Sequence, residues 1–383
     1  MSVVTQQTRR RWSTVAVGII VLLCLPVATS AATSLVHGLT SDDSAPSASA
    51  AVLMKRALAS AQVPHWGLAE SIGNLGLPDL PQLSDVAATL GGSTRTRVWW
   101  SSSESWRVDV LSPTGEQGIY DNGDRTVLWD YERSRLTEVV GTSPVRLPRA
   151  DDLLPPQAAR RLLAGVGSED RIEPLPGRRS VAGLRAEGLR IVPGDRRSTI
   201  GHVDVWLDPD RGLPVAIEVV DRSGVTALSS AFIEVKLATP KPSWVRAPTA
   251  PGAQHDVTDA PDLAARMQRF NDSWLPDSLA GVAASEPIVG GTATYGTGLV
   301  RFVVLTLPGR LGNQILDAAR TGGATELDFS TTGEGVLVSH GLINLVVARA
   351  ANGRTYLIVG LVGGDLLSDV AEDLLTQPPG WRR

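Results

Sequence analysis

Cysteine is nearly absent from this chain of 383 residues, which contains only Cys24. Leu22 and Leu23 precede Cys24 within an apolar run, whereas small residues would precede a lipidated cysteine, so we interpret Cys24 as an ordinary apolar position. Beyond this run the chain has no cysteine, which excludes disulfides, thiolate nucleophiles and cysteine metal sites there. The domains must therefore be held together by their cores alone.

The sequence also lacks the motifs that usually mark an active site or a metal site. Its histidines are scattered, with no His-x-x-x-His pair and no H-E-x-x-H motif. No G-x-S-x-G motif occurs, and Gly296-x-Gly298 lacks the third glycine and the lysine of phosphate-binding loops. His255, Asp256 and Asp259 come nearest to a ligand cluster, but they lie in a Pro-rich segment. We predict no catalytic residue, no metal and no cofactor; the alternative is a hydrolase whose residues assemble only in space.

Lysine is scarce too, since Lys55, Lys236 and Lys241 are the only ones. The formal net charge is −4, and residues 1–31 carry three arginines and no acid, so the rest has 33 basic against 40 acidic residues. A mildly acidic chain is not a general nucleic-acid binder. The hydrophobic content of 43% is that of a globular protein, and the length suggests two domains.

The N-terminus has the pattern of an export signal. Arg9, Arg10 and Arg11 precede an apolar run from Val15 to Val27, and small residues up to Ala32 follow. We expect residues 1–32 to be a signal peptide cleaved near Ala31 or, alternatively, an uncleaved anchor that spans the membrane with residues 12–32. In both cases the remaining chain is extracytoplasmic.

Composition divides the rest of the chain into four segments. Residues 33–50 are rich in Ser, Ala, Asp and Thr and predict a flexible tether. Residues 51–240 predict one domain and residues 262–383 a second one. The segment 241–261 is too rich in proline for a helix or a central strand, and we interpret it as a linker.

The first domain has the alternation of an antiparallel sheet. A helix from Val52 towards Pro64 and a helix over 151–164 are predicted from apolar spacing, and 67–81 is predicted to be a Gly/Pro/Leu-rich loop. Apolar residues alternate with polar ones over 95–100, 105–111 and 127–131. Three further strands, around 203–207, 215–219 and 225–237, are joined by two tight turns and predict a meander.

The second domain mixes helices and strands, which predicts an α+β fold. Helices are expected over 262–270, 309–320 and 365–375. Strands are expected over 300–307, 325–329, 335–338, 342–350 and 355–360, with a hairpin turn at Asn352-Gly353.

Two stretches of the first domain resemble a known family. Residues 97–140, which include YDNGDRTVLWDYERSRLTEV, resemble the early strands of LolA-like and RseB (MucB)-like envelope proteins. Residues 203–237, VDVWLDPDRGLPVAIEVVDRSGVTALSSAFIEVKL, resemble their second hairpin. The resemblance implies an open antiparallel half-barrel with helices across its concave face, followed by a smaller α+β domain. The two-domain layout fits the RseB-type branch better than the single-domain carriers.

The resemblance also implies a function. RseB-type proteins are non-enzymatic regulators that bind the extracytoplasmic part of a membrane-bound anti-sigma factor, and LolA-type proteins carry lipids or lipoproteins. An anchored structural or interaction module is a further alternative.

Four of the ten tryptophans fall in the first sheet, where they either fill the core or line an apolar cavity. By alternation we expect Trp106 and Trp129 to face inward together. The predicted ligand-cavity residues are Trp106, Val108, Val110, Val127, Trp129, Tyr131, Val205 and Ile217.

Overall fold

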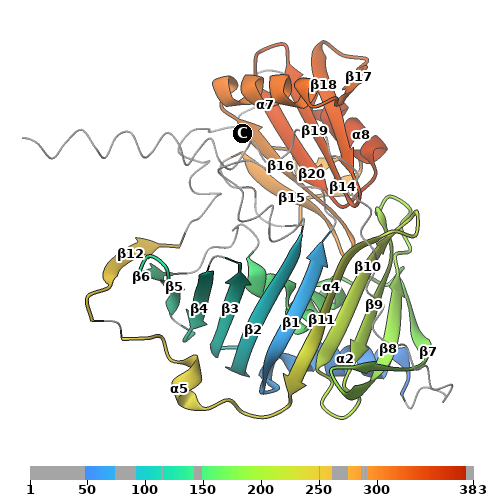
Figure 1. The fold of residues 1–383 in the computed structure, drawn as a ribbon. Coiled ribbons are helices and arrows are strands. Elements are labelled where there is room, and N and C mark those ends of the chain that lie inside the picture. Colours follow the sequence, from blue (N-terminus) through green and yellow to red (C-terminus); the bar gives the residue numbers. More distant parts are fainter. Residues whose placement is uncertain are drawn as a thin grey trace, which may run out of the picture.

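The computed structural model describes residues 48–73, 92–113, 115–123, 125–141, 149–249, 251–260, 275–285, 288 and 291–376. The export segment, residues 74–81 of the expected loop and the expected helix at 262–270 lie outside these residues. The described chain forms two large sheets, one above the other in Figure 1.

The first sheet has twelve strands in the order β12-β6-β5-β4-β3-β2-β1-β11-β10-β9-β8-β7. All neighbours are antiparallel except β12 and β6. Because β12 and β7 stand at opposite edges and do not pair with each other, the sheet is open. The strands are β1 (His65–Gly73), β2 (Ser93–Ser102), β3 (Ser105–Ser112), β4 (Gly115–Asp121), β5 (Arg125–Asp130), β6 (Arg135–Val140), β7 (Arg171–Val181), β8 (Leu184–Val192), β9 (Ile200–Leu207), β10 (Pro214–Asp221), β11 (Thr226–Lys236) and β12 (Gln254–Asp259).

The β9–β11 meander is confirmed, but the loop expected from Gly67 is wrong as far as Gly73, because these residues belong to the central strand β1. Gly67 does not break the strand. A Cβ atom there would lie 2.0 Å from the carbonyl oxygen of Glu234, so the glycine lets β11 approach β1 closely.

Helices cover one face of this sheet, which we call the inner face. They are α2 (Ala50–Ala59), the short 3-10 helices η1 (Ser60–Gln62) and η2 (Ala150–Leu153), and α4 (Pro155–Ala164). Ser49 caps α2 by accepting a hydrogen bond from the Val52 amide, and two prolines begin α4. Leu53 and Leu163 of these helices are fully buried in one core with Val205 and Ile217 of the sheet. In Figure 1 both α-helices lie behind the strands.

The Pro-rich linker crosses the opposite, outer face. It contains one helical turn, α5 (Pro242–Val245), and ends as the edge strand β12, which runs parallel to β6. The expectation that no helix forms here is wrong for this turn, where Pro242 occupies the first helical position and its missing N–H costs nothing. Ala247 and Ala253 of the linker pack against Tyr120, Val127 and Trp129.

The second domain is built on a six-stranded antiparallel sheet in the order β15-β16-β20-β19-β18-β17. Helix α7 (Gly309–Thr321) packs in one apolar core with this sheet and helix α8 (Gly364–Thr376) in another, so the predicted α+β character is confirmed. A two-stranded piece, β13 (Ser278–Leu279) and β14 (Val282–Ala283), precedes the sheet. The strands are β15 (Thr292–Thr297), β16 (Val300–Leu307), β17 (Thr325–Leu327), β18 (Gly333–His340), β19 (Ile343–Ala350) and β20 (Thr355–Gly360).

Candidate binding site

The predicted cavity residues lie on two faces of the first sheet. Trp106 is opposite Asp121 on β4, and Asp121 is opposite Thr126 on β5. Residues opposite one another share a face, so Thr126 lies on the same face as Trp106. Side chains alternate along a strand, so Val127 and Trp129 lie on the other face. The expectation that Trp106 and Trp129 face inward together is therefore wrong. Five of the predicted cavity residues lie on the inner face: Trp106, Val108, Val110, Val205 and Ile217. The other three lie on the outer face: Val127, Trp129 and Tyr131.

The inner-face residues are mostly packed. Val108, Val205 and Ile217 are fully buried, and only 6% of Trp106 is exposed, while Val110 is half-buried. Val205 and Ile217 contact α2 and α4 through their shared core, so these helices occupy the space in front of them. Their role as cavity residues stays a prediction.

A stack of aromatic rings crosses the inner face where β1, β2 and β3 meet. The rings of Trp100 and Trp106 are parallel at 5.5 Å, and the ring of His65 stacks on Trp100 at 6.0 Å. Phe232 closes the stack edge-on to His65 at 5.8 Å. The spacing of such rings is that of favourable aromatic pairs, so the stack forms a rigid apolar wall.

Arg160 on α4 places a cation against this wall. Its guanidinium lies 5.8 Å from the Trp100 ring, and it donates hydrogen bonds to Ser60 Oγ and Gln157 Oε1 at 3.2 and 2.8 Å. Both acceptors are neutral, and no carboxylate pairs with Arg160 among the described residues. Burial lowers the pKa of Arg160 to about 10 because the charged form loses solvation.

His65 is held neutral beside this cation. Burial lowers its pKa to about 4, although Nδ1 lies 2.8 Å from the Val63 carbonyl oxygen, a contact that favours the protonated form. Since a carbonyl only accepts, Nδ1 carries the proton and donates it. The wall therefore holds one charge, that of Arg160. Sequence patterns gave no signal for either residue, because Arg160 lies on a helix and His65 begins an unexpected strand.

One of the three outer-face residues, Tyr131, belongs to a polar cluster. Arg107 donates to Asp109 Oδ1 at 2.7 Å and to the Tyr131 hydroxyl at 2.9 Å, and its guanidinium stacks over the Trp99 ring at 4.4 Å. Asp109 has no exposed surface. Burial raises the pKa of Asp109 to about 6, with Glu116 acting in the same direction and Arg107 opposing the shift.

The two domains meet at the loop between β8 and β9. The Gly363 amide donates to the Arg197 carbonyl at 2.7 Å, and the Thr199 amide donates to the Leu361 carbonyl at 3.1 Å. Ser198 forms a β-bridge with Val362 between these two bonds. The loop of the first domain is thus paired, like a short strand, with the segment that precedes α8.

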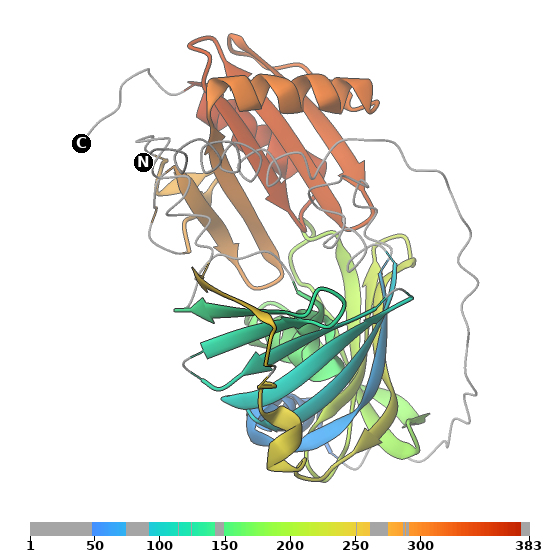
Figure 2. The ribbon, with the colours of Figure 1, turned by 60° about the vertical axis from the view of Figure 1, so that its left-hand side comes forward.

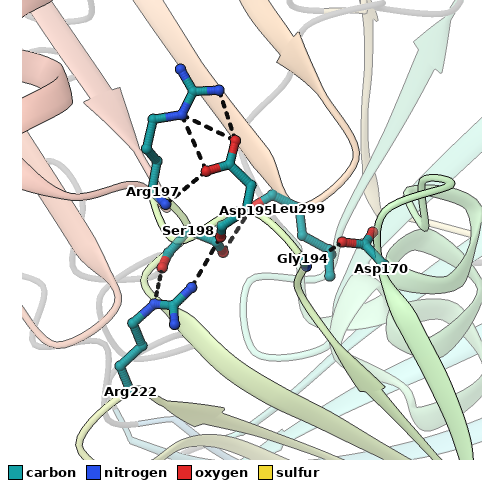
Figure 3. Close-up of polar contacts among 7 residues, drawn as sticks. All are labelled: Asp170, Gly194, Asp195, Arg197, Ser198, Arg222 and Leu299. Carbon is teal, nitrogen blue, oxygen red and sulfur yellow. Dashed lines mark hydrogen bonds and ion pairs between the residues drawn. The ribbon is translucent and has the colours of Figure 1, made fainter.

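Side chains fasten the same loop from both sides (Figure 3). Ser198 Oγ donates to the Leu299 carbonyl at 2.9 Å, and Thr199 Oγ1 donates to the Leu342 carbonyl at 2.7 Å. From the first domain, Arg222 donates to the carbonyls of Ser198 and Asp195 at 2.6 and 3.0 Å. These bonds hold the loop in the conformation that the second domain contacts.

The junction also has an apolar part. Leu299 and Leu342 of the second domain belong to the same core as Ile200 and Leu163 of the first. Ile200 and Leu163 are fully buried, while Leu299 and Leu342 are 6% and 3% exposed. A shared core and a hydrogen-bonded loop together make the junction a fixed contact.

The described residues contain neither a cluster of metal ligands nor a membrane-spanning helix. No group of three or more His, Cys, Asp or Glu side chains lies close enough there to hold a metal ion. No helix in that part of the chain is both long and apolar enough to span a membrane. His255 and Asp256 both lie on β12 and contact the neighbouring β6, His255 Nε2 being 3.9 Å from Glu138 and Asp256 3.7 Å from Arg135.

Comparison with known proteins gives likenesses of fold. No protein-family model and no curated protein matches the chain. The solved MucA/MucB complex of Pseudomonas aeruginosa is similar, with 19% identity, coverage of 85% of this chain and 97% of that chain, and a TM-score of 0.48. MucB alone has the same identity and a TM-score of 0.42, and covers 85% and 96%. A LolA-superfamily protein from Nitrosomonas europaea has 14% identity, covers 52% and 99%, and has a TM-score of 0.24.

The described residues have the architecture that the sequence predicted. An open antiparallel sheet with helices across one face, followed by a smaller sheet domain, is the architecture that the resemblance of residues 97–140 and 203–237 implied. That prediction of fold is confirmed.

Proposed function

We propose that this chain is a non-enzymatic, extracytoplasmic binding protein of the cell envelope, and that it acts as a regulator by binding the extracytoplasmic part of a membrane protein of the anti-sigma-factor class. The observation that carries the proposal is the domain junction. Ser198 and Thr199 bind the second domain through backbone and side-chain bonds, so both domains present one continuous surface to a partner. A carrier of the single-domain type has no use for such a junction.

The packing of the inner face supports the same branch. Lipid carriage needs an apolar space, whereas Val205 and Ile217 are fully buried against α2 and α4. A regulator that binds a protein partner works with these helices in place. The apolar face of the half-barrel then serves as a core, and binding is left to surfaces that include both domains.

A second candidate function, lipid or lipoprotein carriage, is favoured by one observation. Arg160 is a partly buried cation with neutral hydrogen-bond partners, and it lies against the Trp100 ring. An uncompensated cation beside an apolar wall is suited to the anionic head and the chain of an acylated ligand. Helix α4 would have to move away from the sheet to admit the acyl chain of such a ligand.

Native mass spectrometry of the protein isolated from its own host separates the two functions. A regulator should retain a membrane protein, and the extracytoplasmic segment of that protein, made separately, should bind again. A carrier should instead retain a mass that corresponds to an acylated ligand. Recovery of the bare chain together with failure of every candidate segment to bind would overturn the proposal.

The junction provides a sharper variant. Arg222→Ala removes two charge-assisted bonds that hold the 195–198 loop, and it should weaken partner binding by about tenfold while each domain stays folded. Arg171→Ala is the matched control, because Arg171 is exposed at the edge strand β7. Equal affinities of the two variants would show that the junction has no part in binding.

We also propose that the chain is exported. Sequencing the N-terminus of the protein from its host tests this and distinguishes the forms. A start near Ala32 indicates a cleaved signal peptide, and a start at Met1 or Ser2 in a membrane fraction indicates the anchored module. Recovery with Met1 from the cytoplasm would contradict export.

A further inference from the structure

Three tryptophans come together on the outer face of the first sheet. Trp66 on β1 is directly opposite Trp99 on β2, and the Trp66 ring meets that of Trp244 in α5 edge-on at 5.7 Å. All three side chains are half-buried, so part of each indole faces solvent. Two apolar neighbours extend this surface along β1, half-buried Leu68 and Ile72, which is 45% exposed.

Basic side chains surround these rings. Arg97 is opposite Leu68, and Lys236 on β11 is opposite Trp66, so both point to the outer face. Lys241 places its ammonium 5.2 Å from the Trp244 ring. Two of the three lysines of the whole chain are therefore found here. We call the surface formed by Trp66, Leu68, Ile72, Arg95, Arg97, Trp99, Lys236, Lys241 and Trp244 the outer aromatic patch.

The charge of this surface is opposite to that of the chain. The patch has four cations, and the two acids beside them are Glu70, which pairs with Arg95 at 2.9 Å, and Glu234. These six groups have a balance of two positive charges, in contrast to the formal charge of −4 for the whole chain. Arg107, whose guanidinium lies over the Trp99 ring, is paired with Asp109 and Glu116 and is not counted here. Arg97, Lys236 and Lys241 are exposed. No ion pair with another described residue neutralises any of these three.

We propose that the outer aromatic patch docks the protein on the surface of an anionic lipid bilayer. Indole rings are amphipathic and favour the level of the lipid headgroups, where their apolar part is buried and their N–H stays hydrated. Arginine and lysine next to them bind headgroup phosphates and are attracted by the negative surface potential. A soluble acidic protein would satisfy the cations but would leave the exposed part of Ile72 and of the indoles without an apolar partner.

The place of the patch in the fold fits this role. The strands β1, β2 and β11 reach the end of the first sheet that is away from the second domain, and α5 lies near this end (Figure 2). Trp66 is near the start of β1, and Trp99 and Lys236 are near the ends of β2 and β11, so all three lie at this end. Helices α2 and α4 cover the other face of the sheet. Ile72 and Arg95 lie near the other ends of β1 and β2, on the same outer face. Docking through the end that carries the tryptophans would leave the domain junction free. The inference therefore does not depend on the proposed partner.

Vesicle sedimentation tests the proposal with the exported chain in the form isolated from its host. The quantity measured is the ratio of the partition coefficient on vesicles of phosphatidylcholine with phosphatidylglycerol to that on phosphatidylcholine alone. An inserted anchor would bind both vesicles alike, so the ratio reports the patch. We expect a ratio well above one that falls when salt is raised, because screening shortens the reach of the cations.

The decisive variant is Arg97→Gln/Lys236→Gln. Each basic residue near an anionic surface contributes about 1 kcal/mol, so the loss of two should lower the ratio by roughly 30-fold. Lys55→Gln/Arg310→Gln removes the same charge from exposed positions outside the patch and should keep the ratio within about twofold of the original. All four side chains are exposed, so folding is not at risk.

Three outcomes would overturn the proposal. The first is a ratio near one for the unaltered chain. The second is an equal fall for both double variants, which would indicate an effect of net charge alone. The third is a ratio that the patch variant leaves unchanged. Because partner binding is measured separately, each of these results would leave the proposed regulatory function standing.

Discussion

Gly165 and Gly298 meet across the domain junction so closely that a Cβ atom on Gly298 would lie 2.5 Å from the carbonyl oxygen of Gly165. Gly165 ends helix α4 of the first domain, and Gly298 lies in the turn between β15 and β16 of the second. Real Cβ atoms do not come so near to a backbone atom. The backbones of the two domains can therefore touch at this point because Gly298 lacks a side chain, whereas a Cβ atom on Gly165 would lie at a tight 3.2 Å from the Gly298 carbonyl oxygen.

Gly298→Ala should loosen the junction. Gly298 has φ +67°, so alanine costs about 1 kcal/mol in conformation, and the clash with Gly165 adds about 1 to 3 kcal/mol. Hydrogen exchange of the Thr199 and Gly363 amides, which donate across the junction, should become faster. Gly353→Ala is the control, because Gly353 has φ +81° and open space around it, and it should leave these amides protected. Equal exchange in the two variants would contradict the role of the close contact.

His65 should make stability fall in mild acid. Its pKa is about 4 in the folded protein, against about 6.5 when unfolded, so only the unfolded chain takes up a proton between these values. The contribution of His65 is full above pH 6.5 and is lost as the pH falls towards 4, by up to about 3 kcal/mol. His65→Phe keeps a ring in the stack with Trp100, and denaturation at several pH values should give a flatter profile in this window. An unchanged slope would be evidence against a neutral, buried His65.

Asp109 should change the pH dependence of stability in the direction opposite to His65. Its pKa is raised to about 6, so the folded protein holds a proton that the unfolded chain has released above pH 4. The stabilisation is present below pH 4 and is lost as the pH rises through 6. The groups that face Asp109 are Arg107, Glu116, Tyr120 and Tyr131.

Asp109→Asn tests this titration. The amide still accepts from Arg107, and unfolding measured between pH 4 and 7 should show less loss of stability towards neutral pH than in the unaltered protein. The combination with His65→Phe removes two slopes that oppose each other between pH 4 and 6. The two effects should add, since the groups lie on opposite faces of the sheet. A steeper loss in Asp109→Asn would refute the raised pKa.

Gly67→Ala should be one of the most damaging single changes in the first sheet. The new Cβ would meet the backbone of Glu234 at 2.0 Å, and a backbone atom in the middle of a sheet cannot turn aside as a side chain can. We expect a loss of about 3 kcal/mol in the free energy of unfolding, measured with urea. Gly224→Ala, at φ +87° with nothing nearby, should cost about 1 kcal/mol. Similar losses would show that conformation rather than contact explains the effect.

Periodicity predicted the regular elements of this fold because local sequence decides them. The β9–β11 meander has short loops and strict alternation, so the faces of Val205 and Ile217 follow from the sequence, and the structure agrees. Strand β1 was missed because a glycine such as Gly67 can mark a loop or a strand that another backbone approaches closely. The neighbouring sequence looks the same in both cases. Only the partner strand, 167 residues further on, distinguishes the two cases.

The error at Trp129 has a different cause. Alternation fixes which residues share a face within one strand, but the phase between β3 and β5 depends on the register of β4, which was not expected. The register through β4 differs by one residue from the one that was assumed, so Val127 and Trp129 lie on the outer face. The domain junction could not be predicted from the sequence for a similar reason. Ser198 and Val362 are far apart in the sequence and lie in segments without periodicity. The patch likewise depends on a register, that between Trp66 and Trp99.

The edge strand β12 protects the protein from its own copies. No other strand among the described residues pairs with the outer edge of β12, and such an edge can pair with a strand of another molecule. Asp256 and Asp259 stand on this strand, and Val257, which is 65% exposed, is its only large apolar side chain. Two copies that met edge to edge would bring like charges together. By ending as β12, the linker both connects the domains and protects the edge of the larger sheet from pairing with another copy of the chain.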